Sequence, residues 1–461
     1  MTELTAATKL TTETATLPAH EEAWSRRLRE DPHLLADLAR AADGPFHVLH
    51  PGTFADNLRT FQATLRAAGM DGQVMYGAKA NRSPCFLHQC AAAGAGADVA
   101  SAPELLAAVA AGLTGPDLVI TGPAKSTRLL ELALRHDALV AIDALDELRR
   151  VVDLASRGPH RARVLLRVLP DVDPASRFGL DEAELAEAET VCAAAAQDVV
   201  CEGYSFHLGG YEVEPRAALA AVLVQRCRAA RERGLPSRSI SIGGGFAVDY
   251  VPAQHWTEFL TRHDDSWFHA GRRPARFYPY HQSPTGAAML AAILAAPAGP
   301  AGADETLGQA LARDRTRLLL EPGRALLDRS GVSVFSVQGC KTRPGTSGDY
   351  GIVTVDGLSM SVSEQWKGSE FLPDPVLWPA ADGDGPVAAC VGGASCLEYD
   401  MLSWRKITFP RRPRRGDLLI YPNTAGYQMD KNESSFHGLP LPARFAVETG
   451  PDGAPTWQPT T

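Results

Sequence analysis

Eight short apolar runs, each about as long as a β-strand, alternate with longer stretches of helical period between residues 46 and 328. In chain order they read QVMYGAKA, GADVA, DLVIT, ALVAID, RVLLRVLP, EGYSFHLGG, SISIGGG and RLLLEPGR. Eight strands that alternate with helices are the pattern of a (β/α)8 barrel, which uses about 250 residues as one unit. The sequence therefore predicts an α/β fold with a TIM-like barrel domain over residues 46–328.

The residue pattern of the chain changes after residue 328, from alternating strand and helix signals to strand signals alone. Five β-rich segments with Gly/Pro turns follow, namely GVSVFSVQGCKT, YGIVTVDG, PVAACVGG, GDLLIYPN and ARFAVET. Such segments with almost no helix between them predict a second, all-β domain over residues 329–461, either a barrel or a sandwich.

Two further stretches lie outside this alternation. Residues 1–45 are expected to form a loose, Thr-rich arm to about residue 20, followed by an amphipathic helix over 21–42. Between residues 250 and 315 the strand spacing widens, and an aromatic, Pro-bearing stretch precedes an Ala-rich one. This excursion predicts helix and a flexible surface loop.

The charge balance and the apolar runs exclude several kinds of partner. The chain has 45 basic and 54 acidic residues, a net charge of −9 that disfavours nucleic-acid binding. No stretch approaches the roughly 18 apolar residues of a membrane span, and the start lacks the apolar core of a signal peptide. The eight cysteines lack the paired spacing of zinc sites. We therefore expect a cytoplasmic protein with reduced thiols, no membrane or nucleic-acid partner and no metal.

The polar residues that end the barrel runs are candidates for a site, because the carboxyl ends of barrel strands meet at one mouth. They are Lys79, Asp98, His207, Gly243, Gly244, Gly245, Glu321 and Arg324. Singly, each has a plain structural alternative, such as a surface lysine, a tight glycine turn or a satisfied core histidine. Together, a desolvated amine, backbone N–H groups for a phosphate and a flat imidazole fit one ligand, pyridoxal 5'-phosphate.

Over about residues 46–440 the chain resembles the fold-type III pyridoxal-phosphate decarboxylases, the ornithine/arginine/diaminopimelate decarboxylase family. In the barrel domain the matching motifs are YGAKAN (76–81), ADVASAPE (97–104), SRFG (176–179), FHLGG (206–210), GGGF (243–246) and EPGR (321–324). In the second domain they are VDG (355–357), GASCLEYD (393–400) and NTAGYQMD (423–430). The resemblance implies the family's fold and the α-decarboxylation of an amino-acid substrate.

The resemblance also implies roles for individual residues. Lys79 bonds to the cofactor's aldehyde, Glu321 keeps the pyridine nitrogen protonated, and His207 stacks on the ring. The residues that hold the phosphate are Gly244, Gly245, Gly323, Arg324 and Tyr427, while those that order the lysine and the mouth are Asp98 and Arg167. Cys396 returns a proton to the substrate carbon and comes from the opposite protomer, which implies a homodimer with shared active sites.

The chain departs from the family pattern at two positions. Leu397 stands where the family has an acidic residue that grips the substrate's distal amine, and Gly210 replaces a serine of the phosphate site. A leucine cannot pair with an ammonium. The expected substrate is therefore either a diamino acid or a modified or acylated amino acid, the latter in specialised metabolism such as siderophore or antibiotic biosynthesis. The candidate substrate-binding residues are Asp356, Glu398 and Asp400.

Two alternatives to a decarboxylase remain open. An amino-acid racemase or epimerase can use the same scaffold, but fold-type III alanine racemases place an arginine where this chain has Glu321. A non-catalytic binder, like the antizyme-inhibitor relatives of the family, would not need Lys79 and Cys396, which are both intact.

Overall fold

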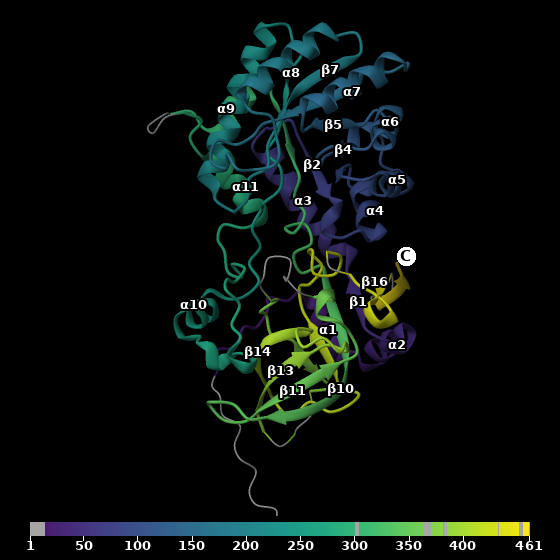
Figure 1. Ribbon diagram of the computed structural model, residues 1–461, viewed down its shortest axis with the longest axis vertical. Coiled ribbons are helices and arrows are strands. Elements are labelled where there is room, and N and C mark those ends of the chain that lie inside the picture. Colours follow the sequence, from purple (N-terminus) through teal and green to yellow (C-terminus); the bar gives the residue numbers. More distant parts are fainter. Residues whose placement is uncertain are drawn as a thin grey trace, which may run out of the picture. The chain divides into compact units, whose positions relative to one another are not determined.

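A computed structural model describes residues 14–299, 304–362, 370–380, 383, 385–431, 433–450 and 455–460 of the chain. The chain divides into two compact units (Figure 1). Of the described residues, the barrel unit contains those within 51–247 and 283–327, and the β unit contains those within 14–50, 248–282 and 328–460. Both units are therefore built from separate stretches of chain, whereas the sequence suggested consecutive domains.

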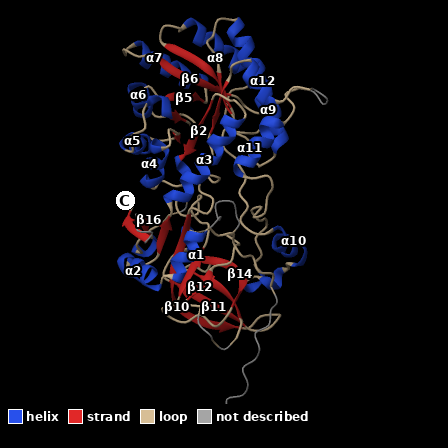
Figure 2. Cartoon of the chain, turned by 180° about the vertical axis from the view of Figure 1, so that it is seen from behind, coloured by secondary structure: helices blue, strands red, loops and turns tan. Residues whose placement is uncertain are grey.

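Eight parallel strands close the barrel unit, paired in the order in which they follow along the chain. They are β2 (Gly72–Gly77), β3 (Gly96–Val99), β4 (Leu118–Ile120), β5 (Leu139–Ile142), β6 (Ala162–Arg167), β7 (Val199–Ser205), β8 (Ser239–Ser241) and β9 (Arg317–Leu320). Each strand lies in one of the eight apolar runs, so the predicted (β/α)8 architecture is confirmed. Figure 2 shows these strands with the helices of the unit outside them.

Nine helices of the barrel unit are described: α3 (Pro51–Ala67), α4 (Pro84–Ala92), α5 (Ala102–Ala110), α6 (Thr127–Arg135), α7 (Leu145–Ser156), α8 (Glu182–Ala194), α9 (Val213–Glu232), α11 (Gly286–Ala295) and α12 (Leu307–Arg313). Several begin where a short polar side chain accepts a backbone N–H, as Ser101 does for α5 and Asp181 for α8. A cluster of five buried apolar side chains fills the barrel interior: Met75, Val119, Leu139, Leu165 and Leu319. The strand ends are thus carried on a packed core rather than around a pore.

A nine-stranded sheet forms the frame of the β unit. Its strands are β1 (Phe46–Leu49), β10 (Gly331–Arg343), β11 (Tyr350–Val355), β12 (Val376–Trp378), β13 (Val387–Gly392), β14 (Met401–Phe409), β15 (Leu418–Tyr421), β16 (Ala443–Thr449) and β17 (Pro455–Pro459). The strand β1 pairs antiparallel with β10 and parallel with β16. Residues 46–49 therefore belong to the β unit and not to the barrel, because their pairing partners are residues 331–334 and 443–446 of that unit.

The N-terminal stretch differs from the expected arm and single helix. The helical region divides into α1 (Ala23–Glu30) and α2 (Pro32–Ala42), because Pro32 has no N–H to continue a helix and Asp31 caps the second one. Residues 14–20 are not a loose arm: Leu17 is buried, and its N–H donates to the Asp374 carboxylate at 2.7 Å. Residues 1–13 lie outside the described part of the chain.

The excursion over residues 250–315 is shared between the two units. Its first part contains α10 (Ala253–Arg262) and belongs to the β unit, where the Tyr250 ring lies 5.5 Å from Tyr280 and 6.0 Å from Phe371. Its second part supplies α11 and α12 of the barrel unit. The expected surface loop includes residues 300–303, which lie outside the described residues. Aromatic packing therefore explains why a stretch that interrupts the barrel in sequence joins the β unit.

The described residues contain no helix that is both long enough and apolar enough to cross a membrane. All eight cysteines are free thiols, and five of them are buried. Cys396 is the exposed one.

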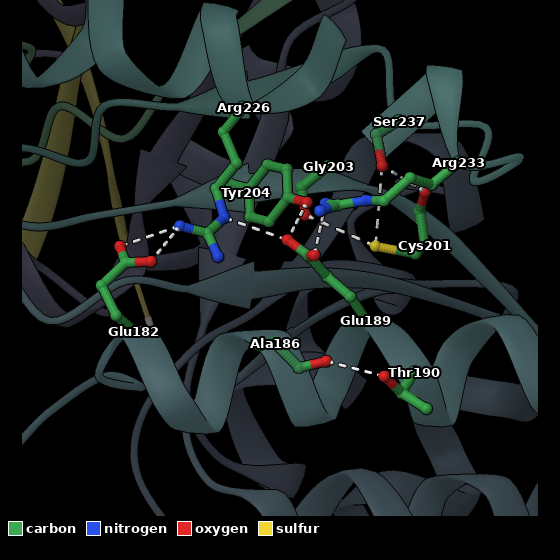
Figure 3. A network of polar contacts seen from close by, with 10 residues as sticks. All are labelled: Glu182, Ala186, Glu189, Thr190, Cys201, Gly203, Tyr204, Arg226, Arg233 and Ser237. Carbon is green, nitrogen blue, oxygen red and sulfur yellow. Dashed lines mark hydrogen bonds and ion pairs between the residues drawn. The ribbon is translucent and has the colours of Figure 1, made fainter. Parts of the chain in front are cut away.

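A buried carboxylate ties two barrel helices to a strand. Glu189 of α8 accepts hydrogen bonds from the Tyr204 hydroxyl of β7 at 2.7 Å and from Arg226 of α9 at 3.0 Å (Figure 3). Arg233 also pairs with it, at 2.5 Å. The carboxylate of Glu182 binds the outer side of Arg226 at 2.8 Å but is largely exposed. Glu189 is therefore the buried carboxylate of this network, and its negative charge balances the guanidinium groups of Arg226 and Arg233.

We expect Glu189→Gln to destabilise the barrel unit by about 2 kcal/mol, because it removes the buried charge that Arg226 and Arg233 both bind. Urea unfolding followed by circular dichroism measures the change. The matched control is Glu182→Gln, which should cost no more than about 0.5 kcal/mol because the lost pair is exposed. Equal losses in the two variants would show that burial of Glu189 does not set the strength of the network.

Candidate active site

The amine of Lys79 lies at the carboxyl end of the barrel strands. The residue occupies a single 3-10 turn, Ala78–Ala80, that directly follows β2, and its Nζ donates to Asp98 Oδ2 at 2.7 Å. Asp98 is the penultimate residue of β3 and is 2% exposed, and its other oxygen accepts from the Thr121 hydroxyl at 2.5 Å. Because Asp98 is held on both oxygens, it fixes the position of the amine, whose side chain remains 44% exposed.

Glu321 follows β9 and lies fully inside the same end of the barrel. Its carboxylate accepts a hydrogen bond from Ser241 Oγ of β8 at 2.5 Å. Burial, together with the nearby charge of Asp98, raises the pKa of Glu321 to about 7, against the opposing effect of Lys79. The site thus contains a carboxyl that can hold or release a proton near neutral pH.

The imidazole of His207 follows β7 and is neutral. Burial lowers its pKa to about 3, and the positive charges of Lys79 and Arg167 act in the same direction. Its Nδ1 accepts the backbone N–H of Gly244 at 3.4 Å. An uncharged ring that is exposed at the mouth presents a flat face to a ligand and cannot compete with Lys79 for an anion.

The three glycines after β8 form a turn into which no side chain fits. Gly243 and Gly245 have φ values of 66° and 78°, the left-handed region that favours glycine. A Cβ on Gly244 would lie 2.7 Å from the carbonyl oxygen of Glu321, and one on Gly245 would lie 2.5 Å from the guanidinium of Arg216. The backbone N–H groups of this turn are therefore not covered by side chains of their own, as an anion cradle requires.

Two residues that the sequence did not single out support this end of the barrel. Arg216 of α9 is 1% exposed, and it donates to the carbonyl oxygens of Ile242 at 3.1 Å and Gly210 at 3.4 Å. Asp143, which follows β5, binds Arg167 at 3.2 Å and the N–H of Gly179 at 3.2 Å. Asp143 ends the run ALVAID and could have been found by its strand-end position, whereas an arginine inside a helix carries no such signal.

Arg324 and Gly323 complete the set of barrel residues predicted from sequence. Arg324 follows β9 and is 7% exposed. The Cα of Gly323 lies 3.7 Å from where a Cβ on Gly77 would stand, so the end of β2 and the segment after β9 lie side by side. The barrel unit therefore brings together Lys79, Asp98, Arg167, His207, Gly244 and Glu321, with Gly245, Gly323 and Arg324 on the adjoining turns.

The remaining predicted residues lie in the β unit. Cys396 stands on the exposed loop between β13 and β14, with its Sγ 3.1 Å from His437 Nε2. The Asp400 carboxylate is buried and accepts the N–H groups of Ser359 and Ser395, so it holds the loop instead of facing outward. Glu398 lies on the same loop, and Tyr427, with a φ of 72°, lies on a turn after β15.

Asp356 adjoins the Cys396 loop through its neighbour in sequence. The carbonyl oxygen of Gly357 accepts the Ala394 N–H at 2.9 Å. Burial raises the pKa of Asp356 to about 6, although its carboxylate accepts the N–H of Ser336 at 2.9 Å. The three motifs predicted in the second domain are therefore all found in the β unit, and two of them are in direct contact.

A lysine beside a buried carboxylate, a turn of three glycines and an uncharged flat ring define a barrel enzyme site of the pyridoxal type. In agreement, residues 52–269 match the pyridoxal-binding domain of the pyridoxal-dependent decarboxylases. The chain is 35% identical to an uncharacterized protein of Sinorhizobium fredii, y4yA, over 93% of each chain. It is 24% identical to the diaminopimelate decarboxylase of Bacillus subtilis, over 90% of this chain and 88% of that one.

Solved structures share the fold at lower identity. Diaminopimelate decarboxylase from Helicobacter pylori, complexed with L-lysine, is 18% identical and gives a TM-score of 0.69 over 93% of this chain and 97% of that one. The arginine decarboxylase of Paramecium bursaria Chlorella virus, bound to agmatine, is 17% identical with a TM-score of 0.68, over 88% and 97%. The chain belongs to the fold-type III pyridoxal-phosphate-dependent decarboxylases, and its cofactor is pyridoxal 5'-phosphate.

The raised pKa of Glu321 predicts how the stability of the cofactor-free protein depends on pH. A carboxyl whose pKa rises on folding stabilises the fold fully below its ordinary value of 4.5, and this contribution is lost as the pH rises through about 7. Glu321→Gln removes the ionisation and keeps an oxygen for Ser241. We expect the variant to equal the wild type near pH 5 and to be more stable near pH 8.5, by on the order of 3 kcal/mol.

Urea unfolding of the cofactor-free proteins at both pH values measures this difference. Glu131→Gln, at an exposed position of α6, is the control. Its stability should differ from that of the wild type by the same amount at both pH values. A gain in stability that is the same at both pH values would contradict the ionisation of a buried Glu321.

Proposed function

We propose that this enzyme removes the α-carboxylate of a modified or acylated amino acid, at a site that a second copy of the chain completes. The observation that carries the proposal is the arrangement at the barrel mouth, where Lys79 lies 2.7 Å from Asp98 and both charges act on the buried Glu321. One amine and two carboxyl groups with distinct surroundings suit a ligand that carries an aldehyde at one end and a basic ring nitrogen at the other.

When bound, pyridoxal 5'-phosphate supplies a protonated pyridine ring that accepts the electron pair released as the Cα–carboxylate bond breaks. Lys79 supplies the amine that attaches to the aldehyde, and Asp98 orients this amine. Glu321 holds a proton at the pyridine nitrogen, because the positive ring nitrogen offsets the cost of a buried carboxylate. An uncharged His207 packs on the ring face without repelling the cationic ring.

The phosphate is assigned to the glycine turn and its neighbours. The N–H groups of Gly244 and Gly245 supply donors without any side chain to order, and the guanidinium of Arg324 supplies charge. Gly323 lies beside Arg324 on the segment after β9 and contributes its backbone to the phosphate site. Tyr427 of the β unit donates its hydroxyl to the phosphate. Arg167, held by Asp143 at 3.2 Å, orders the mouth from the other side.

Cys396 is proposed to deliver a proton to the substrate carbon in the active site of the partner protomer, which makes the enzyme an obligate homodimer. In support, Cys396 is exposed, and its loop also exposes Leu397 and Tyr399, by 48% and 67%. Large exposed side chains on a loop held rigidly by Asp400 suit a partner surface. The eight free thiols support a reducing, cytoplasmic location.

The surroundings of Leu397 support a substrate whose distal end is not a bare ammonium. The guanidinium of Arg272 lies 5.1 Å from the ring of Tyr399, and its charge repels a cation that approaches the loop. Asp400 is occupied by backbone N–H groups, which leaves Glu398 and Asp356 as candidate contacts for a polar group. An acylated or otherwise modified side chain fits this setting, and such substrates occur in specialised metabolism.

A panel of free diamino acids and their distally acylated forms tests the proposed function. We expect labelled CO2 to be released fastest from an acylated or modified member, because Leu397 offers an apolar contact and no ion pair. Loss of optical rotation without CO2 would indicate a racemase, and the absence of both activities across the panel would contradict an amino-acid decarboxylase.

Leu397→Glu is the matched specificity variant. It adds the carboxylate that a distal ammonium needs at a position that is 48% exposed, so it should raise kcat/KM for free diamino acids by about tenfold relative to the acylated forms. Leu397→Gln controls for polarity without charge. An unchanged ratio in the Glu variant would remove residue 397 from the substrate pocket.

The shared site predicts complementation between two inactive variants. Lys79→Ala lacks the amine at the mouth, and Cys396→Ala lacks the proton donor on the loop. If each site uses one residue from each chain, mixing equal amounts after dissociation gives mixed dimers with one intact site, and about a quarter of the wild-type CO2 release returns. Each variant mixed with itself is the control. No recovery, with mixed dimers verified by mass spectrometry, would place both residues in one chain's site.

A further inference from the structure

A histidine of the β unit holds the thiol of Cys396. The Sγ of Cys396 lies 3.1 Å from Nε2 of His437, and the backbone N–H of Cys396 points to the same nitrogen at 3.4 Å. Since both groups of Cys396 are donors, Nε2 carries the lone pair and the ring proton sits on Nδ1. The imidazole therefore accepts from the thiol, and the two side chains form a pair that can share one proton.

The loop that carries Cys396 is fixed from within. The Asp400 carboxylate accepts the N–H of Ser395 at 3.0 Å and that of Ser359 at 2.7 Å. A Cβ on Gly393 would lie 2.2 Å from the same carboxylate, so only glycine fits there. Asp400 thus ties one end of the loop to Ser395 near its other end and to Ser359 of a separate turn, which holds the backbone around Cys396 in place.

His437 is also held in an unusual backbone conformation. Its φ is 61° in the turn Phe436–Gly438, a left-handed conformation that is unfavourable for a residue with a side chain. The rings of Phe436 and His437 lie 4.2 Å apart, and the Leu439 N–H closes the turn on the Phe436 carbonyl at 3.3 Å. The turn thus orients the imidazole toward Cys396 at some cost in strain.

The charged groups on the neighbouring elements have partners of their own. On the Cys396 loop, Asp400 is bound by backbone N–H groups, and the charge of Glu398 acts on His269. On the segment before the turn, Asp430 and Glu433 both pair with Arg444. These carboxylates therefore interact with other groups, and the thiol of Cys396 has the imidazole of His437 as its hydrogen-bond acceptor.

We propose that His437 is a positioning residue that orients the Cys396 thiol and restores its proton in each turnover. The inference deepens the proposed function and rests on it, because it takes Cys396 as the donor to the substrate carbon. The S–H bond breaks as the new C–H bond forms, which leaves a thiolate beside His437. The imidazole then takes one proton from water and passes it from Nε2 to Sγ. One solvent proton is consumed for each CO2 released, so the reaction balances.

The pH dependence of Cys396 alkylation tests the pair without any substrate. The holoenzyme is treated with iodoacetamide from about pH 5 to pH 9, and the modified cysteine is quantified by peptide mapping. The thiolate is the form that is alkylated, and a neighbouring imidazole takes the thiol proton as the sulfur attacks. We expect His437→Gln to lose at least tenfold in alkylation rate at pH 7 relative to the wild type, because the thiol has lost the base that takes its proton.

His437→Gly guards against a failure to fold, because glycine adopts the positive φ of this turn without strain. Added imidazole should restore its alkylation rate in part, and its decarboxylation rate in proportion. His88→Gln, an exposed histidine of α4, is the control and should match the wild type. Superimposable alkylation profiles for the wild type and both His437 variants, without any effect of imidazole, would overturn the proposal. The alkylation result stands apart from CO2 release, so it distinguishes a wrong role for His437 from a wrong proposed function.

Discussion

The closing of eight parallel strands into a barrel is the constraint on which the rest of the site depends. Parallel closure places every strand's carboxyl end on one rim, so residues as distant in sequence as Lys79 and Glu321 share one electrostatic environment. There, Asp98 binds the amine and at the same time raises the pKa of Glu321. The barrel thus prepares a cation and a protonatable carboxyl before the cofactor arrives.

Much of the barrel could be predicted from sequence, because apolar runs of strand length and polar residues at their ends are local signals. The parts that escaped prediction depend on distant pairing. The strand β1 reads like any other apolar run, and only its partners β10 and β16 assign it to the β unit. Arg216 and His437 likewise show no local pattern. A helical arginine and a loop histidine are recognised only by their contacts, which are the Gly210 carbonyl for Arg216 and the Cys396 thiol for His437.

The departures from the family's motifs have physical explanations in the structure. Gly210 has a φ of 79°, and a Cβ there would lie 2.3 Å from the carboxylate of Glu212, so this loop has given up a side-chain donor. Arg216 instead binds the Gly210 carbonyl and lies against Gly245, and its buried guanidinium supports a cradle made of backbone N–H groups. At position 397 an apolar, exposed leucine stands where the family motif has a carboxylate.

The proposed function depends on the covalent attachment of the cofactor to the amine of Lys79. Reduction of the purified protein with borohydride in the presence of pyridoxal 5'-phosphate, followed by peptide mapping, tests this most directly. The account predicts a single labelled residue, Lys79, within the peptide that contains YGAKAN. Label on another lysine, such as the buried Lys125 that pairs with Glu147 at 2.9 Å, or no label at all, would contradict it.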